Sequence, residues 1–215
     1  MEELYSNLAP VWDATLTATG FKRGLCSYVV KNLSEYKDSN LRVLDVGCGT
    51  GLVSFVILKK CPKAEVVATD LNRELVKKTE TLAERKKIDK NRLTVGVADV
   101  LNQDRISLSD GSSMELKKGS FDVVIASGVL EYTPLDVAVP KLLDLTKENG
   151  RLLVVSMKDD PVGKLWGKMY KFRPIKKGNL EDHLTCCGCR LVEHRPLTLK
   201  EFPTNITRTG YMAIK

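Results

Sequence analysis

The most informative pattern in the chain is an apolar run that ends in glycines. Residues 41–46 are strand formers, and Gly47, Gly49 and Gly51 follow at alternate positions. An amphipathic pattern starts at once from Leu52, so the stretch predicts a strand, a tight glycine loop and a helix. We expect a ligand to lie against the bare backbone of this loop, with the helix N-terminus behind it offering free N–H groups to a negative group.

The alternation of apolar runs with amphipathic stretches continues to the end of the chain. It implies an α/β fold with a parallel sheet and helices on both faces. Ligands of such sheets bind at the C-terminal ends of the strands, where the strand order reverses. Because Asp45, Asp70, Asp99 and Ser127 all lie at or near the predicted ends of strands, one crevice is expected to collect them. The predicted strands are residues 41–46, 64–70, 93–98, 121–127, 151–157, 189–193 and 207–214.

Several connections carry local signals. Residues 101–119 are longer than an ordinary connection, and the turn signal Asp110-Gly111 predicts a surface loop or short hairpin there. Thr133 and Pro134 are typical of a helix start, and Asn149-Gly150 is the expected end of that helix.

A further helix is expected from Asn179, which can cap it, to Gly188, which suits the residue after a helix. Cys186, Cys187 and Cys189 lie at its end. They lack the CxxC pair and second ligand pair of a typical zinc site, so we expect small buried apolar residues and no metal.

One domain over residues 1–215 is the simplest interpretation of this 23.9 kDa chain. It has no run of about 18 apolar residues that would predict a transmembrane helix. Its acidic start does not resemble a signal peptide. We therefore expect a cytoplasmic protein with six reduced cysteines. The net charge of +7 permits an anionic partner without identifying one, and the oligomeric state stays open.

Two segments flank the nucleotide-binding pattern. Residues 1–38 carry apolar side chains at helical spacing and predict an N-terminal helical cap. Residues 158–178 predict a basic and aromatic flap: from 158 to 177, seven lysine or arginine residues face two aspartates, and Trp166 is among the aromatic residues. That composition suits a membrane surface, a phosphate-bearing substrate or RNA. It equally suits a solvated flap whose aromatic residues pack on the core.

The glycine spacing narrows the ligand class. The dinucleotide fingerprint is G-x-G-x-x-G, whereas this chain has G-x-G-x-G with Leu52 in place of the third glycine. Asp45, two residues before the loop, would repel a pyrophosphate and attract a cation. A nucleoside with a positive part is therefore expected, and S-adenosylmethionine fits that description.

The segment LDVGCGTG at residues 44–51 resembles the first motif of class I S-adenosylmethionine-dependent methyltransferases. Residues 67–71, 97–100, 121–132 and 150–155 resemble the family's following motifs, in order. The resemblance implies a Rossmann-like, seven-stranded, mostly parallel sheet whose last strand is antiparallel. The start of the chain, from Tyr5, partly resembles quinone-biosynthesis C-methyltransferases, which makes Tyr5 a substrate-side candidate.

The resemblance also implies the cofactor roles. Asp45 would orient the ammonium group, directly or through water, and Asp70 would accept both ribose hydroxyls. Asp99 would accept from the adenine amino group, with Val100 and Leu71 packing on the ring. Ser127 and Gly128 would line the reactive end, and the loop residues Gly47, Cys48, Gly49 and Gly51 would lie under the methionine part.

A catalytic base is harder to name. Glu131, Tyr132 and His183 are the candidates, and Trp166 joins Tyr5 on the substrate side. We expect methyl transfer to a small-molecule or lipid-like acceptor. The alternatives are an RNA or protein methyltransferase that uses the basic flap, and a non-catalytic nucleotide-binding protein or NAD-dependent oxidoreductase.

Overall fold

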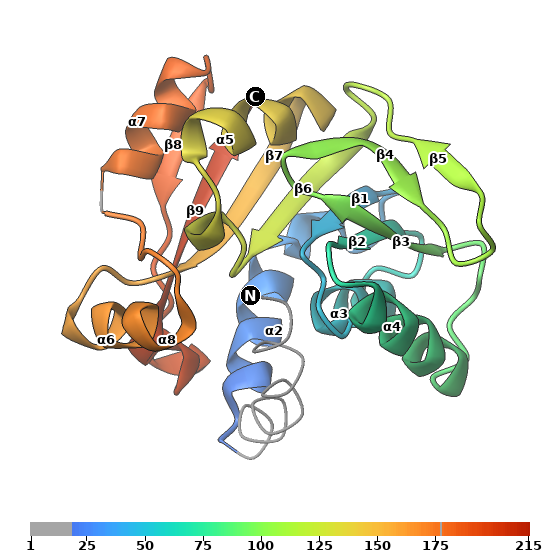
Figure 1. The fold of residues 1–215 in the computed structure, drawn as a ribbon, viewed down its shortest axis with the longest axis horizontal. Coiled ribbons are helices and arrows are strands. Elements are labelled where there is room, and N and C mark those ends of the chain that lie inside the picture. The colour runs from blue at the N-terminus through green and yellow to red at the C-terminus, as the bar shows by residue number, and fades with distance from the viewer. Residues whose placement is uncertain (1–18, 177) are drawn as a thin grey trace.

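The computed structural model describes residues 19–176 and 178–215, and within them nine strands form one mixed sheet (Figure 1). Five neighbouring strands, from β3 through β2, β1 and β6 to β7, are parallel. The last strand, β9, runs antiparallel between β7 and β8, which confirms the expected topology. The strands are β1 (Arg42–Val46), β2 (Glu65–Asp70), β3 (Leu93–Asp99), β4 (Asn102–Ser107), β5 (Ser113–Glu115), β6 (Phe121–Ser127), β7 (Thr146–Met157), β8 (Leu191–His194) and β9 (Arg208–Ile214).

The sheet has two strands more than the seven expected. They come from the long connection 101–119, where β4 pairs antiparallel with β3 and β5 pairs with β4. Ile106 is fully buried and Leu116 is 3% exposed, so the hairpin contributes to the core instead of lying loose on the surface. Its turn is closed by a hydrogen bond from the Leu108 N–H to the Ser112 carbonyl (2.9 Å).

Helices cover both faces of the sheet, as the alternation predicted. One buried cluster joins α2, α3 and α4 to the sheet, and the other joins α5 and α7 to the opposite face. In the described residues no helix is both long enough and apolar enough to cross a bilayer. The helices are α2 (Phe21–Asn32), η1 (Ser34–Tyr36), α3 (Leu52–Lys60), α4 (Arg73–Arg85), η2 (Leu130–Tyr132), α5 (Leu135–Leu145), α6 (Pro161–Tyr170), α7 (Asn179–Cys186), η3 (Leu199–Glu201) and α8 (Thr204–Thr207).

Two helix boundaries differ from the expectation. Helix α5 has Pro134 as its N-cap, while Thr133 donates its hydroxyl to the Leu130 carbonyl. The helix ends at Leu145 rather than at Asn149-Gly150, because its last carbonyls accept backbone N–H groups from the loop before β6. Helix α7 has Gly178 as its N-cap, and no side chain caps it.

The prediction that Cys186, Cys187 and Cys189 are buried is wrong. Gly188 does follow α7 with a left-handed φ of 82°, as predicted. However, Cys186 and Cys187 are exposed, and Cys189 is only partly buried. Leu180 and Leu184 supply the buried face of this short helix, which leaves Cys187 on the outer side.

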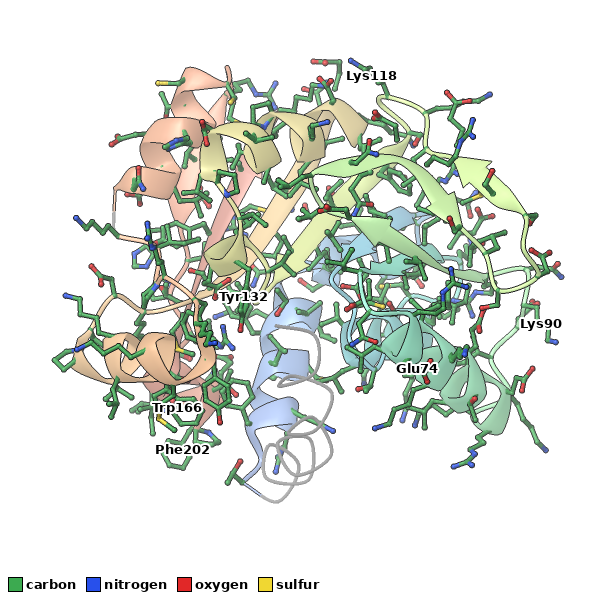
Figure 2. The ribbon with its side chains drawn as sticks, in the orientation of Figure 1. Glu74, Lys90, Lys118, Tyr132, Trp166 and Phe202 are labelled. Atoms are coloured by element: carbon green, nitrogen blue, oxygen red, sulfur yellow. The ribbon has the colours of Figure 1, made fainter. Side chains whose placement is uncertain are left out.

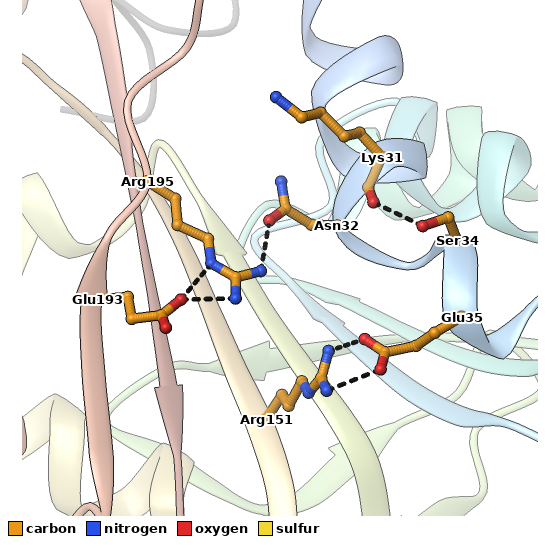
Figure 3. A network of polar contacts seen from close by, with 7 residues as sticks. All are labelled: Lys31, Asn32, Ser34, Glu35, Arg151, Glu193 and Arg195. Atoms are coloured by element: carbon orange, nitrogen blue, oxygen red, sulfur yellow. Dashed lines mark hydrogen bonds and ion pairs between the residues drawn. The ribbon is translucent and has the colours of Figure 1, made fainter.

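The described part of the N-terminal segment is held by polar contacts to β7 and to the residue that follows β8. The Glu35 carboxylate accepts two hydrogen bonds from the Arg151 guanidinium on β7, and Arg195 donates to the Asn32 side chain at the end of α2 (3.1 Å) (Figure 3). The Tyr28 hydroxyl donates to the Arg195 carbonyl (2.6 Å). Helix α2 is therefore held firmly on the sheet. Residues 1–18, the first part of the expected cap, lie outside the described residues.

Candidate active site

A cavity of about 530 Å³ opens at the carboxyl ends of β3, β2, β1 and β6, where the sequence placed the crevice. Its wall has two halves. The glycine loop after β1 and strands β2, β3 and β4 supply one half, and β6, η2, β7, α6 and β9 supply the other. The lining includes Gly47, Gly49, Asp70, Leu71, Asp99, Val100, Gln103, Ser127, Gly128, Tyr132, Met157, Trp166, Tyr170, Lys171, Phe172 and Arg208.

The glycine loop combines left-handed backbone with close packing. Gly47, Gly49 and Gly51 have φ values of 64°, 56° and 75°, which disfavour other residues. A Cβ atom on Gly47 would collide with Val129, and one on Gly51 would lie 2.7 Å from the Thr79 side chain. A Cβ atom on Gly49 would meet nothing within 4 Å. Since Gly49 lines the cavity, that open space is where a ligand can approach the backbone.

Asp70, the last residue of β2, links the loop to the next helix. Its carboxylate accepts from the Gly49 N–H (2.8 Å) and from the Asn72 N–H (2.9 Å). Burial raises the pKa of this carboxyl, and the two backbone hydrogen bonds act in the opposite direction. Asn72 itself caps α4, so Asp70 is left facing the cavity.

Asp45 does not reach the cavity wall. It is 1% exposed, and one carboxylate oxygen accepts from the Ser54 N–H (3.0 Å) and hydroxyl (2.5 Å). Burial raises the pKa of the Asp45 carboxyl to about 7, against the effect of the Ser54 hydrogen bonds. The Asp45 carboxylate therefore does not line the cavity, and its hydrogen bonds to Ser54 link β1 to the start of α3. Cys48 and Gly51 also lie off the lining; Cys48 is 8% exposed.

The half formed by β2, β3 and β4 brings together Leu71, Asp99 and Val100, as expected. Leu71 is 58% exposed on the wall, and Asp99 accepts from the Leu101 N–H (2.9 Å). The sequence did not indicate Gln103 on β4. This side chain is buried, and no partner for its Nε2 donor occurs among the described residues.

The other half is aromatic. Tyr132 on η2 packs against Phe172, with ring centroids 5.5 Å apart, and Trp166 stacks on Tyr170 at 5.6 Å (Figure 2). Ser127 and Gly128, at the end of β6 next to β1 in the sheet, also line the cavity. The predicted substrate-side Trp166 therefore lines the same cavity as the predicted cofactor residues.

Glu131 occupies a different place from the one expected of a base. It is 5% exposed and absent from the lining. One oxygen accepts from the Met157 N–H (2.6 Å) and from the Arg208 guanidinium (2.9 Å). This arrangement fixes Arg208, which does line the cavity. No sequence pattern indicated Arg208, because only the pairing of β9 with β7 sets it opposite Met157.

His183 lies on α7 and is absent from the lining, with its Nδ1 2.7 Å from the Asn179 carbonyl oxygen. Helix α7 packs on α5 and β8, on the sheet face covered by α5. Of the three candidate bases, only Tyr132 therefore reaches the cavity. The remaining substrate-side candidate, Tyr5, lies outside the described residues.

Comparison with known proteins agrees with this geometry. A family model described as "Methyltransferase domain" matches residues 37–207. The magnesium protoporphyrin IX methyltransferase of Synechocystis PCC 6803, solved with bound S-adenosylhomocysteine, has the same fold: the TM-score is 0.68 at 18% identity, over 91% of this chain and 84% of that one.

Two curated relatives are similar in sequence. The malonyl-[acyl-carrier protein] O-methyltransferase of Priestia megaterium is 25% identical over 71% of this chain. The ubiquinone/menaquinone biosynthesis C-methyltransferase of Agrobacterium fabrum is 25% identical over 74% of it. The chain spans 49% and 58% of the lengths of these relatives. Because the family model covers most of the chain, this protein belongs to the methyltransferase-domain family, with the fold of the class I S-adenosylmethionine-dependent methyltransferases.

Proposed function

We propose that this chain transfers a methyl group from S-adenosylmethionine to a small-molecule or lipid-like acceptor. One observation carries the proposal: a single cavity joins a glycine-and-carboxylate half to an aromatic half. The cofactor would supply the methyl group on a sulfonium. The protein would hold the acceptor in line and in contact with it, which is the main requirement of a displacement on an activated carbon.

Two features of the cavity fit an adenosyl ligand. The open space beside Gly49 leaves room against the backbone, and the buried Gln103 lacks a partner for its Nε2 donor in the described residues. Asp70 would accept from the ribose hydroxyls, as acids at this strand end do in nucleotide-binding folds. Asp99 and Gln103 would face the polar edge of the adenine, with Leu71 and Val100 on its faces.

The acceptor would lie in the aromatic half, between Tyr132 and Trp166. The aromatic rings favour an unsaturated or lipid-like acceptor, and Lys171 and Arg208 on the same wall would attract an anionic group on it. The names of the two relatives support this class in part: one names ubiquinone and menaquinone biosynthesis, and the other names a malonyl group on an acyl-carrier protein. If the acceptor must lose a proton, Tyr132 is the candidate base on the wall.

A methylation screen tests the proposal. The full chain is incubated with methyl-labelled S-adenosylmethionine and separate fractions of lipids, small metabolites, protein and RNA. Label is expected in a lipid or small-molecule fraction. Tyr132→Phe and Trp166→Ala should lower that transfer about tenfold or more, while His183→Ala, off the cavity, should not. Label confined to RNA or protein would contradict the proposal.

A further inference from the structure

Helix α6 turns Val162, Leu165 and Met169 to solvent and its glycines to the protein, while Trp166 and Tyr170 line the cavity. Gly163 and Gly167 are buried, and a Cβ atom on Gly167 would lie 2.7 Å from the Phe172 carbonyl oxygen. Val162, Leu165 and Met169 are 42%, 58% and 59% exposed. Their spacing of three and four residues puts them on one helix face. This is the reverse of an ordinary surface helix, which buries such a stripe.

The segment from η3 to α8 shows the same reversal. Glu201 is 1% exposed, and its carboxylate accepts from the Thr198 N–H and hydroxyl, both at 2.7 Å. Its apolar neighbours point outward: Leu199 is 84% exposed and Phe202 is 64% exposed. Ile206 on α8 adds a third side chain, 50% exposed.

The two exposed stripes are parts of one surface. The Lys158 N–H donates to the Thr207 carbonyl (2.9 Å), and the Lys158 ammonium donates to the Asn205 carbonyl (2.5 Å), which ties the start of α6 to α8. Figure 1 shows α6 and α8 next to each other at the lower left of the view. We call this surface the outer apolar face; it comprises Val162, Leu165, Met169, Leu199, Phe202 and Ile206.

The charges beside the outer apolar face are mainly positive. Lys164, Lys168, Lys171 and Lys200 are exposed on the same segments. The nearby acids are engaged: Asp160 caps α6 by accepting from the Gly163 N–H (2.7 Å), and Asp159 lies 3.5 Å from Lys164. Exposed apolar side chains flanked by lysines match the chemistry of an anionic lipid surface.

We propose that the outer apolar face docks on an anionic lipid bilayer. All side chains of the face except Phe202 are non-aromatic; they can enter the acyl boundary but cannot stack on bases, so the face fits lipid better than RNA. The aromatic wall of the cavity shares α6 with this face. Docking would therefore bring the acceptor half of the cavity to the membrane interface, a consequence that rests on the proposed function, whereas the docking itself does not.

Vesicle flotation of the full chain tests the docking. We expect binding to vesicles that contain phosphatidylglycerol, weaker binding to phosphatidylcholine alone, and loss of binding at high salt. The double variant Leu165→Gln/Met169→Gln should bind at least tenfold less. Lys164→Gln/Lys168→Gln should lose about fivefold per lysine.

Matched controls distinguish docking from a general change in non-specific adsorption to vesicles or in folding. Leu191→Gln, 39% exposed at the β8 edge, and Lys77→Gln/Lys78→Gln on α4 should bind vesicles like the wild type. Thermal unfolding and titration with S-adenosylmethionine should be unchanged in every variant. Cofactor binding without vesicle binding would overturn the docking and leave the proposed function standing.

Other occupants of the face give distinct results that overturn the proposal. A concentration-dependent dimer that the Leu165→Gln/Met169→Gln variant abolishes would assign the face to a second copy. Binding of single-stranded RNA that the same variant weakens, without vesicle binding, would assign it to RNA. A monomer that binds neither lipid nor RNA would also overturn the proposal.

Discussion

Asp45 and Asp70 are alike in sequence, yet the fold gives them different surroundings. Asp45 lies one residue before the end of β1, and strand alternation turns it to the face where α3 brings Ser54. Asp70 is the last residue of β2 and faces the cavity. A sequence pattern shows that both acids follow apolar strands, but it does not show which one a helix will cover.

Replacing Asp45 by asparagine should remove a pH dependence of the free energy of unfolding. Burial raises the pKa of this carboxyl from 3.8 to about 7. Below the lower value both states are protonated. Between the two values only the unfolded chain releases its proton, so stability falls as the pH rises, by up to about 4 kcal/mol. Urea unfolding across this range measures the effect; a constant difference between wild type and Asp45→Asn would contradict it.

Asp70→Ala should weaken S-adenosylmethionine binding about a hundredfold or more. The change removes the carboxylate proposed to accept from two ribose hydroxyls, and hydrogen bonds to charged groups are worth about 1.5–3 kcal/mol each. Calorimetric titration measures the affinity. Asp110→Ala, in an exposed turn off the cavity, is the control and should bind as the wild type does. Equal affinity of all three proteins would refute the ribose assignment.

At the scale of elements, the glycine loop allows a matched comparison. Gly49 and Gly111 both have left-handed φ values, 56° and 88°, and a Cβ atom on either meets nothing within 4 Å. Alanine at either position should therefore cost a similar amount of stability, about 1–2 kcal/mol. Only Gly49 lines the cavity.

Gly49→Ala should consequently lose cofactor affinity, whereas Gly111→Ala should keep it. Chemical denaturation and calorimetric titration of both variants make the comparison. If the two variants lose affinity equally, or if neither does, the space beside Gly49 is not where the cofactor meets the backbone.

The Glu131–Arg208 pair should behave as one unit that shapes the cavity wall. Arg208→Met leaves the buried Glu131 carboxylate without its cation and should cost about 3–5 kcal/mol in stability. Adding Glu131→Gln should recover part of that loss, because the uncompensated charge disappears. Urea unfolding of the single and double variants measures this coupling. Strictly additive losses would show that the two side chains act independently.

The sequence predicted most of the elements because their signals are local. The apolar runs and the glycine loop identified the parallel strands and the positions of Asp70 and Asp99. The hairpin of β4 and β5 is harder, because polar residues separate its buried Ile106 and Leu116. Arg208 and Gln103 were missed since only strand pairing brings them to the cavity. Glu131 was misplaced because its partners lie far along the chain.

At the scale of the whole molecule, α6 contributes both to the cavity and to the outer apolar face. Its inner side and the following residues contribute Trp166, Tyr170 and Phe172 to the cavity, and its outer side carries Leu165 and Met169. A lipid-like acceptor would therefore have a short path from a docked membrane to the aromatic half. The net charge of +7 favours approach to an anionic surface, and added salt screens this attraction.

A crystal structure of the full chain with S-adenosylhomocysteine would show whether Asp70 holds the cofactor. We expect the ribose hydroxyls on the Asp70 carboxylate, the adenine between Leu71 and Val100, and the sulfur directed toward the aromatic half. A ligand bound elsewhere, or an empty cavity with the Asp70 carboxylate turned away from it, would refute the proposed cofactor site.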